Sequence, residues 1–355
     1  MRVGKEPDQG SWLPSSERFN LVCGGQIITV YPTKYLQMDK LPDAIRQDRI
    51  CRAAFARWGS GGESLGSTTL EGLSLSAECD TRTGLPFKMG AFDLDGTVLR
   101  RDLRITTRTV AALDKLRRRG VRLVVATGRR FEGARGYAER LGFAGQDPLI
   151  CYGGSMVRRM DGETLLHRTL QRSLSVEVLE WAAERDLHAR VFVDGRIITS
   201  PDTPAVLRHL RRSEEPGVSV VDSPAGWVRD GGEEPTKLVL VDQPDDVERW
   251  LKEARAAFAG RLFVTRSLPH YVEVGGLNGT KSKALEFLCG LWGVDPTRVI
   301  AFGDADNDVD MLRFVGHGVA VGVMTDEVRE AADAVVPSVD EDGVASYLER
   351  LLEGV

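Results

Sequence analysis

From residue 88 onward, short apolar runs alternate with segments in which apolar residues recur every three or four positions. The apolar runs at 88–94 and 121–127 predict buried strands, and the amphipathic segment 106–120 between them predicts a helix that Thr106 or Thr107 can cap. Further apolar runs predict strands at 148–157, 298–303, 318–323 and 333–337. Strands and helices in alternation predict a parallel sheet with helices on both faces.

A second alternating block lies between residues 173 and 265. It begins with a predicted helix at 175–186, followed by a hairpin at 188–200 in which Asp194-Gly195 supplies the turn. The remaining pattern predicts helices and strands at 204–212, 236–242, 245–258 and 260–266. This block is long enough to form a small α/β domain of its own.

The pattern divides the chain into three parts. We expect the fold class α/β, with a Rossmann-like parallel-sheet core domain at 89–172 and 266–355 and an inserted smaller α/β domain at 173–265. Residues 1–88 lack this alternation, and their glycine/serine-rich stretch 58–76 is typical of a flexible linker. We therefore expect the N-terminal extension to be poorly ordered, and a chain without it to keep the stability and activity of the whole.

Polar side chains follow the predicted strands at the points where the strands end. The carboxyl ends of parallel strands meet at one edge of a sheet, where ligands bind. Two aspartates, a threonine, a glycine and an Asp/Asn cluster stand at such ends, and a lysine stands at the start of an amphipathic helix. The candidate site residues are Asp93, Asp95, Thr127, Gly128, Lys281, Asp304, Asn307 and Asp308.

These residue types fit phosphoryl chemistry. Carboxylate oxygens without histidine or thiolate suit Mg²⁺. A carboxylate beside magnesium and lysine can attack a phosphoryl group, and a second acid can protonate the leaving oxygen and later activate water. Taken singly, Asp-x-Asp-Gly could be a turn, and the acidic run 303–308 a solvated loop. Their joint position at strand and helix ends favours the catalytic interpretation.

Composition narrows the partners. The net charge of −5 gives no basic field for nucleic acid, and no apolar run is long enough to span a bilayer. The five cysteines are scattered without zinc-type spacing, so a reduced, cytoplasmic protein is expected. Neither nucleic acid nor a membrane is therefore expected as a partner. The oligomeric state stays open.

Four motifs carry a resemblance to a known family. In order, "DLDGTVL", "VVATGR", "GTKSKAL" and "GDADNDVDML" resemble the motifs of the haloacid dehalogenase-like superfamily, and the insert resembles the cap domain of its Cof-like phosphatases. The similarity runs from about Met89 to Leu352. It implies a magnesium-dependent phosphatase whose partner is a small phosphorylated metabolite, either a sugar phosphate or a phosphorylated cofactor, which it hydrolyses through an aspartyl phosphate. The alternatives are a phosphomutase of the same superfamily or, in another class, a receiver-like signalling protein.

The resemblance also implies roles for individual residues. Asp93 would be the nucleophile and Asp95 the general acid/base. Mg²⁺ would be bound by Asp93, the main-chain carbonyl of Asp95, Asp304 and Asp308. The phosphoryl group would be bound by Thr127, Gly128, Lys281 and Asn307.

The sequence departs from the family pattern at three places. Asparagine is common in related phosphatases at the positions of Gly153, Val323 and Val339. The candidate catalytic residues are untouched, so these departures leave hydrolysis as the expected reaction. They leave open the substrate and the local loop geometry.

Overall fold

The computed structural model describes residues 19–23, 26–31, 74–77, 85–201 and 217–353. The helix predicted at 204–212 and most of the N-terminal extension lie outside these residues. That the extension is poorly ordered therefore stays a prediction. Within it, three strands form an antiparallel sheet, and the third overlaps the end of the predicted linker: β1 (Phe19–Cys23), β2 (Gln26–Tyr31) and β3 (Ser74–Ala77).

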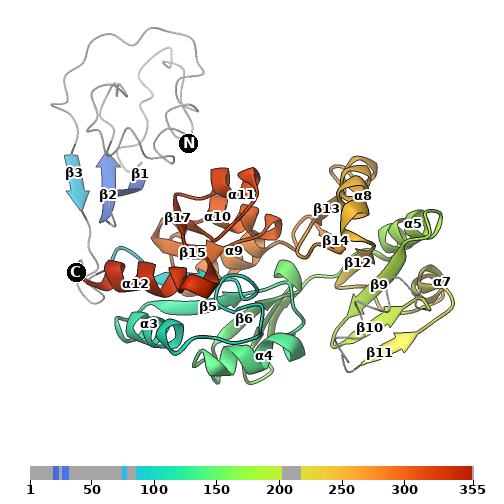
Figure 1. Cartoon of the computed structure of the whole chain (residues 1–355), viewed down its shortest axis with the longest axis horizontal. Helices are drawn as coiled ribbons and strands as arrows, with labels where there is room; N and C mark the ends of the chain where they lie inside the picture. The colour runs from blue at the N-terminus through green and yellow to red at the C-terminus, as the bar shows by residue number, and fades with distance from the viewer. Residues whose placement is uncertain (1–18, 24–25, 32–73, 78–84, 202–216, 354–355) are drawn as a thin grey trace, which may run out of the picture.

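The core domain is built on an eight-stranded sheet (Figure 1). Its order is β17 (Ala334–Val336), β16 (His317–Val321), β15 (Val299–Gly303), β4 (Met89–Phe92), β5 (Arg122–Ala126), β6 (Pro148–Cys151), β7 (Met156–Arg159) and β8 (Thr164–His167). Neighbours from β17 to β6 are parallel, whereas β7 and β8 are antiparallel additions. The predicted α/β fold with a parallel core sheet is confirmed.

The single strand predicted at 148–157 is wrong. The structure has two antiparallel strands there, β6 and β7, joined by the 3-10 helix η3 (Tyr152–Gly154). The backbone φ angles of Tyr152, Gly153 and Gly154 are all positive, at 52°, 70° and 116°. This left-handed conformation, which glycine adopts at no steric cost, reverses the chain.

Helices cover both faces of the core sheet because successive strand residues point to opposite sides. Phe92 of β4 packs into the cluster that contains α3 (Thr107–Arg118), α4 (Phe131–Arg140) and α12 (Gly343–Glu353). Met89 and Ala91 pack into the cluster on α9 (Lys281–Trp292), α10 (Val309–Phe314) and α11 (Asp326–Ala331). The predicted cap of α3 is confirmed, since the Thr106 side chain accepts a hydrogen bond from the amide of Thr109.

The inserted domain has its own sheet and its own apolar cluster. The predicted hairpin is confirmed as two antiparallel strands. The sheet order is β11 (Val218–Val220), β10 (Arg196–Thr199), β9 (His188–Val193), β12 (Lys237–Val241), β14 (Tyr271–Gly276) and β13 (Leu262–Thr265). Its helices are α5 (Arg172–Ala183), α7 (Pro224–Arg229) and α8 (Pro244–Ala257). Because β14 pairs with β12 and β13, this sheet continues past residue 265, where the sequence places the end of the insert.

The chain joins the core before residue 88. Leu85 and Phe87 are 0% and 1% exposed and belong to the same apolar cluster as Phe92. The amide of Lys88 donates to the carbonyl of Arg298 at 2.8 Å. Removal of everything up to residue 88 would strip two buried side chains from the core, so the structure does not support the expectation that such a chain keeps its stability.

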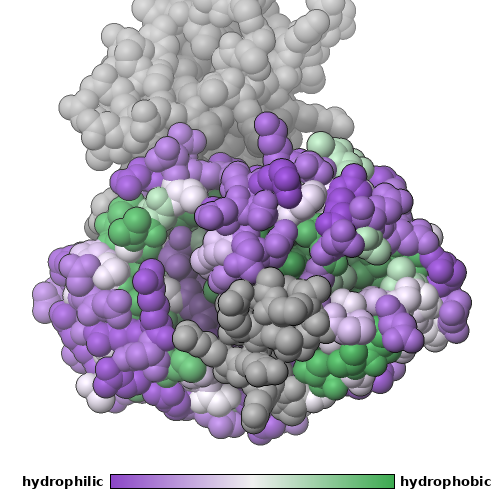
Figure 2. Space-filling model, turned by 45° about the vertical axis from the view of Figure 1, so that its right-hand side comes forward, coloured by the Kyte–Doolittle hydropathy of each residue, from purple (hydrophilic) through white to green (hydrophobic). Residues whose placement is uncertain are grey.

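The face in Figure 2 is predominantly hydrophilic, with hydrophobic residues in small separate groups. Among the described helices, none combines the length and apolar character that crossing a membrane requires.

Candidate active site

Three neighbouring strands of the core sheet end at the candidate site. β4 pairs in parallel with β15 on one side and β5 on the other. Asp93 follows β4, Thr127 follows β5 and Asp304 follows β15 directly. The strand order therefore brings these three residues to one edge of the sheet.

Lys281 lies at the centre of the polar cluster. It is the first residue of α9, after the N-cap Thr280, and its side chain is 0% exposed. Its Nζ donates to Asp93 Oδ1 and to Asp308 Oδ1, both at 2.6 Å. Gly154 permits this placement, since a Cβ there would lie 2.0 Å from the carbonyl carbon of Thr280. The turn that interrupts the predicted strand thus packs directly on the start of α9.

Three carboxylates surround this ammonium. One oxygen from each of Asp93, Asp304 and Asp308 lies within 4.8 Å of the others. Asp308 Oδ2 accepts from the amides of Asp304 and Ala305, both at 3.1 Å. Thr97, which the sequence analysis missed, donates its hydroxyl to Asp304 Oδ1 at 3.1 Å. These hydrogen bonds fix the carboxylates before any ligand binds.

The electrostatics of the cluster favour an added cation. Burial raises the pKa of Asp93 well above its usual value; Lys281 opposes this, and the neighbouring aspartates add to it. Burial and Asp308 raise the pKa of Asp304 to about 7. Burial would lower the pKa of Lys281, but Asp308 and Asp93 outweigh it and raise that pKa. One ammonium does not compensate the three acids, and their oxygen-only donor set fits a hard divalent cation.

Asp95 has a different partner from the other acids. Its two carboxylate oxygens accept from Nε and Nη2 of Arg129, at 2.7 and 2.6 Å. The Arg129 guanidinium also lies 4.8 Å from the ring centroid of Tyr137. This bidentate pair occupies both oxygens of Asp95, so a proton transfer through Asp95 would require the pair to open.

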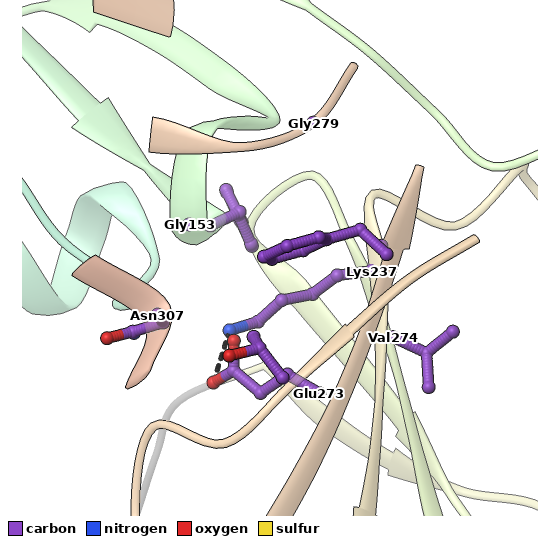
Figure 3. A pocket seen from close by; sticks show the side chains of 10 residues that line it. Gly153, Lys237, Glu273, Val274, Gly279 and Asn307 are labelled. Carbon is purple, nitrogen blue, oxygen red and sulfur yellow. Dashed lines mark ion pairs between the residues drawn. The ribbon is translucent and has the colours of Figure 1, made fainter. Parts of the chain in front are cut away.

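A pocket lies beside the residues predicted to bind phosphate (Figure 3). Thr127 is 0% exposed, and its hydroxyl accepts from the amide of Arg129 at 3.2 Å. Asn307 lines the pocket, and its Nδ2 lies 3.6 Å from where a Cβ on Gly128 would be. The pocket is also lined by Tyr152, Gly153, Lys237, Phe263, Thr265, Glu273, Val274, Gly275 and Gly279.

Sequence reasoning missed the charged residues of this pocket. Lys237 and Glu273 come from β12 and β14 of the inserted sheet, and their side chains are 5% and 10% exposed. Each is a charged residue in an otherwise apolar strand, which was the available signal. Lys237 Nζ donates to the carbonyl of Gly128 at 2.8 Å, so the insert touches the predicted phosphate loop.

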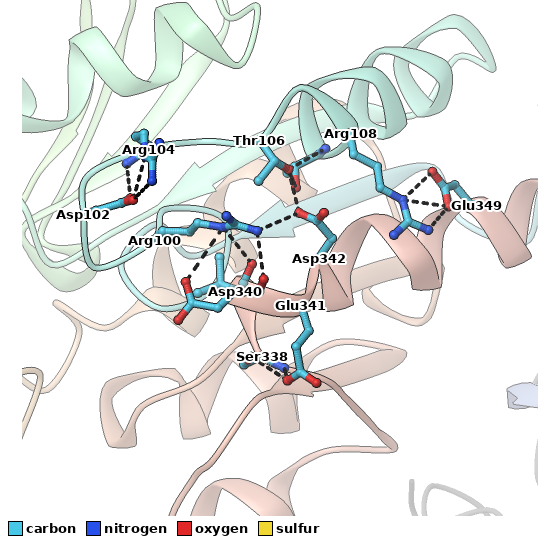
Figure 4. Close-up of polar contacts among 12 residues, drawn as sticks. Arg100, Asp102, Arg104, Thr106, Arg108, Ser338, Asp340, Glu341, Asp342 and Glu349 are labelled. Carbon is cyan, nitrogen blue, oxygen red and sulfur yellow. Dashed lines mark hydrogen bonds and ion pairs between the residues drawn. The ribbon is translucent and has the colours of Figure 1, made fainter.

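The three departures from the family pattern have different surroundings. Gly153 lines the pocket, whereas Val323 is 99% exposed. The main-chain carbonyl of Val339 accepts a hydrogen bond from Arg100 Nε at 3.3 Å. The nearby Asp342 accepts a hydrogen bond from the Thr106 hydroxyl at 2.7 Å (Figure 4). These contacts hold the loop after β4 against residues 339–342, which directly precede α12. The departures at 323 and 339 therefore lie outside the pocket lining, and the one at 153 lies in it.

Comparison with known proteins gives a consistent picture. The sequence profile of the haloacid dehalogenase-like hydrolases matches residues 91–348. The chain is 30% identical over 264 residues to the phosphoglycolate phosphatase of Methanopyrus kandleri, covering 74% of this chain and 96% of that protein. It is 29% identical over 268 residues to the HMP-PP phosphatase of Serratia proteamaculans, covering 75% and 96%. A solved haloacid dehalogenase-like hydrolase from Bacteroides thetaiotaomicron matches 75% of this chain and 99% of its own, with 26% identity and a TM-score of 0.62.

Proposed function

Since the chain belongs to the haloacid dehalogenase-like hydrolases, as a Cof-like phosphoric monoester hydrolase, we propose that it is a magnesium-dependent phosphatase that works through an aspartyl phosphate. The observation that carries the proposal is the position of Lys281, whose ammonium joins Asp93 and Asp308 at 2.6 Å inside a cluster of acids. The substrate is a small phosphorylated metabolite.

In the first step a carboxylate oxygen of Asp93 attacks the phosphorus, and the bond from phosphorus to the leaving oxygen breaks. Asp95, protonated and released from Arg129, gives its proton to that oxygen. In the second step Asp95 takes a proton from water, the water oxygen attacks the phosphorus, and Asp93 is regenerated with release of phosphate. Lys281 and the Thr127 hydroxyl face the phosphoryl oxygens and compensate their charge.

Mg²⁺ would be held by Asp93, Asp304 and the main-chain carbonyl of Asp95, with Asp308 in support. When bound, it supplies positive charge beside the phosphoryl oxygens. The raised pKa values of Asp93 and Asp304 support this assignment, because a cation removes the cost of ionising crowded, buried acids. We also propose that the inserted domain covers the site as a cap, and that the protein is cytoplasmic, which its free Cys151 and Cys289 support.

Substitution of the nucleophile tests the proposal. Asp93→Asn should abolish phosphate release from p-nitrophenyl phosphate in the presence of Mg²⁺, because an amide cannot accept the phosphoryl group. Asp102→Asn is the matched control, since Asp102 is an exposed acid of the same loop whose partner is Arg104. Unchanged turnover by Asp93→Asn, in a protein that stays folded, would refute the mechanism.

A further inference from the structure

The start of α9 and the start of α10 are joined at two points. Asp308 Oδ1 accepts a hydrogen bond from Lys281 Nζ at 2.6 Å. Asp310 Oδ2 accepts a hydrogen bond from the main-chain amide of Ser282 at 3.0 Å. Two acids that lie two residues apart therefore hold two consecutive residues of α9. The first contact belongs to the candidate active site, and the second touches only the main chain of α9.

Asp310 completes the capping of α9. The first amides of a helix have no acceptor within that helix. The N-cap Thr280 accepts from the amide of Lys283 at 3.4 Å, and Asp310 supplies an acceptor for the amide of Ser282. A carboxylate at this end of a helix also interacts favourably with the helix dipole. Asp310 thus fixes the first turn of α9, which begins with Lys281.

Both chain neighbours of Lys281 are held in place. On one side, the close approach of Gly154 restricts Thr280, because a Cβ on Gly154 would lie 2.0 Å from the carbonyl carbon of Thr280. On the other side, Asp310 holds the amide of Ser282. The main chain that carries the Lys281 ammonium is therefore fixed before and after that residue.

The side chain of Asp310 makes a single hydrogen bond within the described part of the chain. Its Oδ2 accepts from Ser282, whereas its Oδ1 is buried and has no partner there. A buried carboxylate oxygen without a partner is unfavourable. The hydrogen-bond stabilisation of this side chain thus comes entirely from the contact with α9, and that contact is what its removal would abolish.

We propose that Asp310 is a positioning residue for phosphoryl transfer and acts through Lys281. The inference rests on the proposed function, in which the Lys281 ammonium compensates the charge of the phosphoryl oxygens. The ammonium has to keep its place while it exchanges contacts with carboxylates for contacts with the phosphoryl group. Asp310 provides this by holding the first turn of α9, and a displacement of about 1 Å at a reacting centre can cost about a hundredfold in rate.

Loss and rescue of turnover test this role. Asp310→Ala should lower kcat for p-nitrophenyl phosphate by roughly ten- to a hundredfold and change KM far less. Asp310→Asn keeps an oxygen that can accept from Ser282, so it should retain most of kcat. Asp326→Ala is the matched control, because Asp326 is an exposed acid at the first position of α11, and it should leave kcat unchanged. Melting curves show whether each variant is folded, and Asp310→Ser, whose side chain is one bond shorter, replaces an alanine variant that is not.

A double-mutant cycle shows whether the effect passes through Lys281. In a protein that already carries Lys281→Met, Asp310→Ala should change the residual kcat by less than about twofold. Losses that multiply across the cycle would overturn the positioning role. So would an unchanged kcat in Asp310→Ala, or a loss in Asp310→Asn as large as that in Asp310→Ala. Failure of the unsubstituted protein to hydrolyse any phosphate ester would instead refute the proposed function, and the role of Asp310 with it.

Discussion

Lys281 is the buried cation on which the site depends, so its replacement by methionine tests the structural reasoning directly. The ammonium is 0% exposed and lies 2.6 Å from one oxygen each of Asp93 and Asp308. Methionine keeps an unbranched side chain of similar length but leaves the acids without their cation. Removing one partner of a buried ion pair costs about 3–5 kcal/mol. At about 2–4 °C per kcal/mol, the melting temperature should fall by roughly 6–20 °C.

The loss of stability in Lys281→Met should depend on pH and on Mg²⁺. Without the ammonium, the raised pKa values of Asp93 and Asp304 rise further above the value of about 4 in the unfolded chain. The folded variant then holds more protons than the unfolded one, so its stability falls as pH rises. The deficit relative to the unsubstituted protein should be larger at pH 8 than at pH 5, and Mg²⁺ should recover part of it. Turnover should fall by at least about a hundredfold, since a donor to the phosphoryl group is lost.

Differential scanning fluorimetry at both pH values, with Mg²⁺ or with EDTA, measures these effects. Lys283→Met is the matched control, because Lys283 is 45% exposed and its partner Glu286 is an exposed neighbour on the same helix. The control substitution should change the free energy of unfolding by less than about 1 kcal/mol. If the Lys281 variant melts within a degree or two of the control at pH 8 without metal, the buried ion-pair reasoning is wrong.

Three further predictions follow from other contacts. Arg129→Gln should raise the ratio of kcat/KM for an alkyl phosphate to that for p-nitrophenyl phosphate, because it removes the ion pair that Asp95 must leave before it protonates the poorer leaving group. A lower ratio would contradict this. A chain that begins at residue 89 should melt at least about 6 °C below one that begins at residue 84, since it lacks the buried side chains of Leu85 and Phe87. The rise in melting temperature on adding Mg²⁺ should grow from pH 6 to pH 8, because protons compete with the metal for Asp304, whose pKa is raised to about 7. The metal-free protein should lose stability over the same pH interval. A Mg²⁺ effect that is independent of pH would contradict the assignment.

The candidate active-site residues could be located in the sequence because apolar runs show where the strands end. Asp93 and Thr127 each follow an apolar run, and parallel strands place such residues at one edge of the sheet. The sequence does not give the order of the strands. The observed order sets β15 beside β4, which brings Asp304 to Asp93 across a large separation in the chain.

The turn at 152–154 has a signal in the sequence, but the apolar residues around it outweighed that signal. Apolar residues on both sides of it favoured one continuous strand. The paired glycines Gly153 and Gly154 are a turn signal, and in the structure both have positive φ. The wrong prediction of one strand matters for the candidate site, because the turn places Gly154 against the start of α9 and Gly153 in the pocket lining.

Lys237 and Glu273 could not be assigned from the sequence, and the reason is physical. A charged residue in an apolar strand has the same local pattern whether it faces solvent at an edge or pairs with an opposite charge inside. Only the pairing of β12 with β14 and the packing of their shared face on the core domain decide between these cases. The residues proposed to act on the phosphoryl group lie in short motifs at strand ends, where local pattern places them. The charged residues of the pocket acquire their neighbours from strand pairing and domain packing, so the reaction type is far easier to infer from this sequence than the substrate.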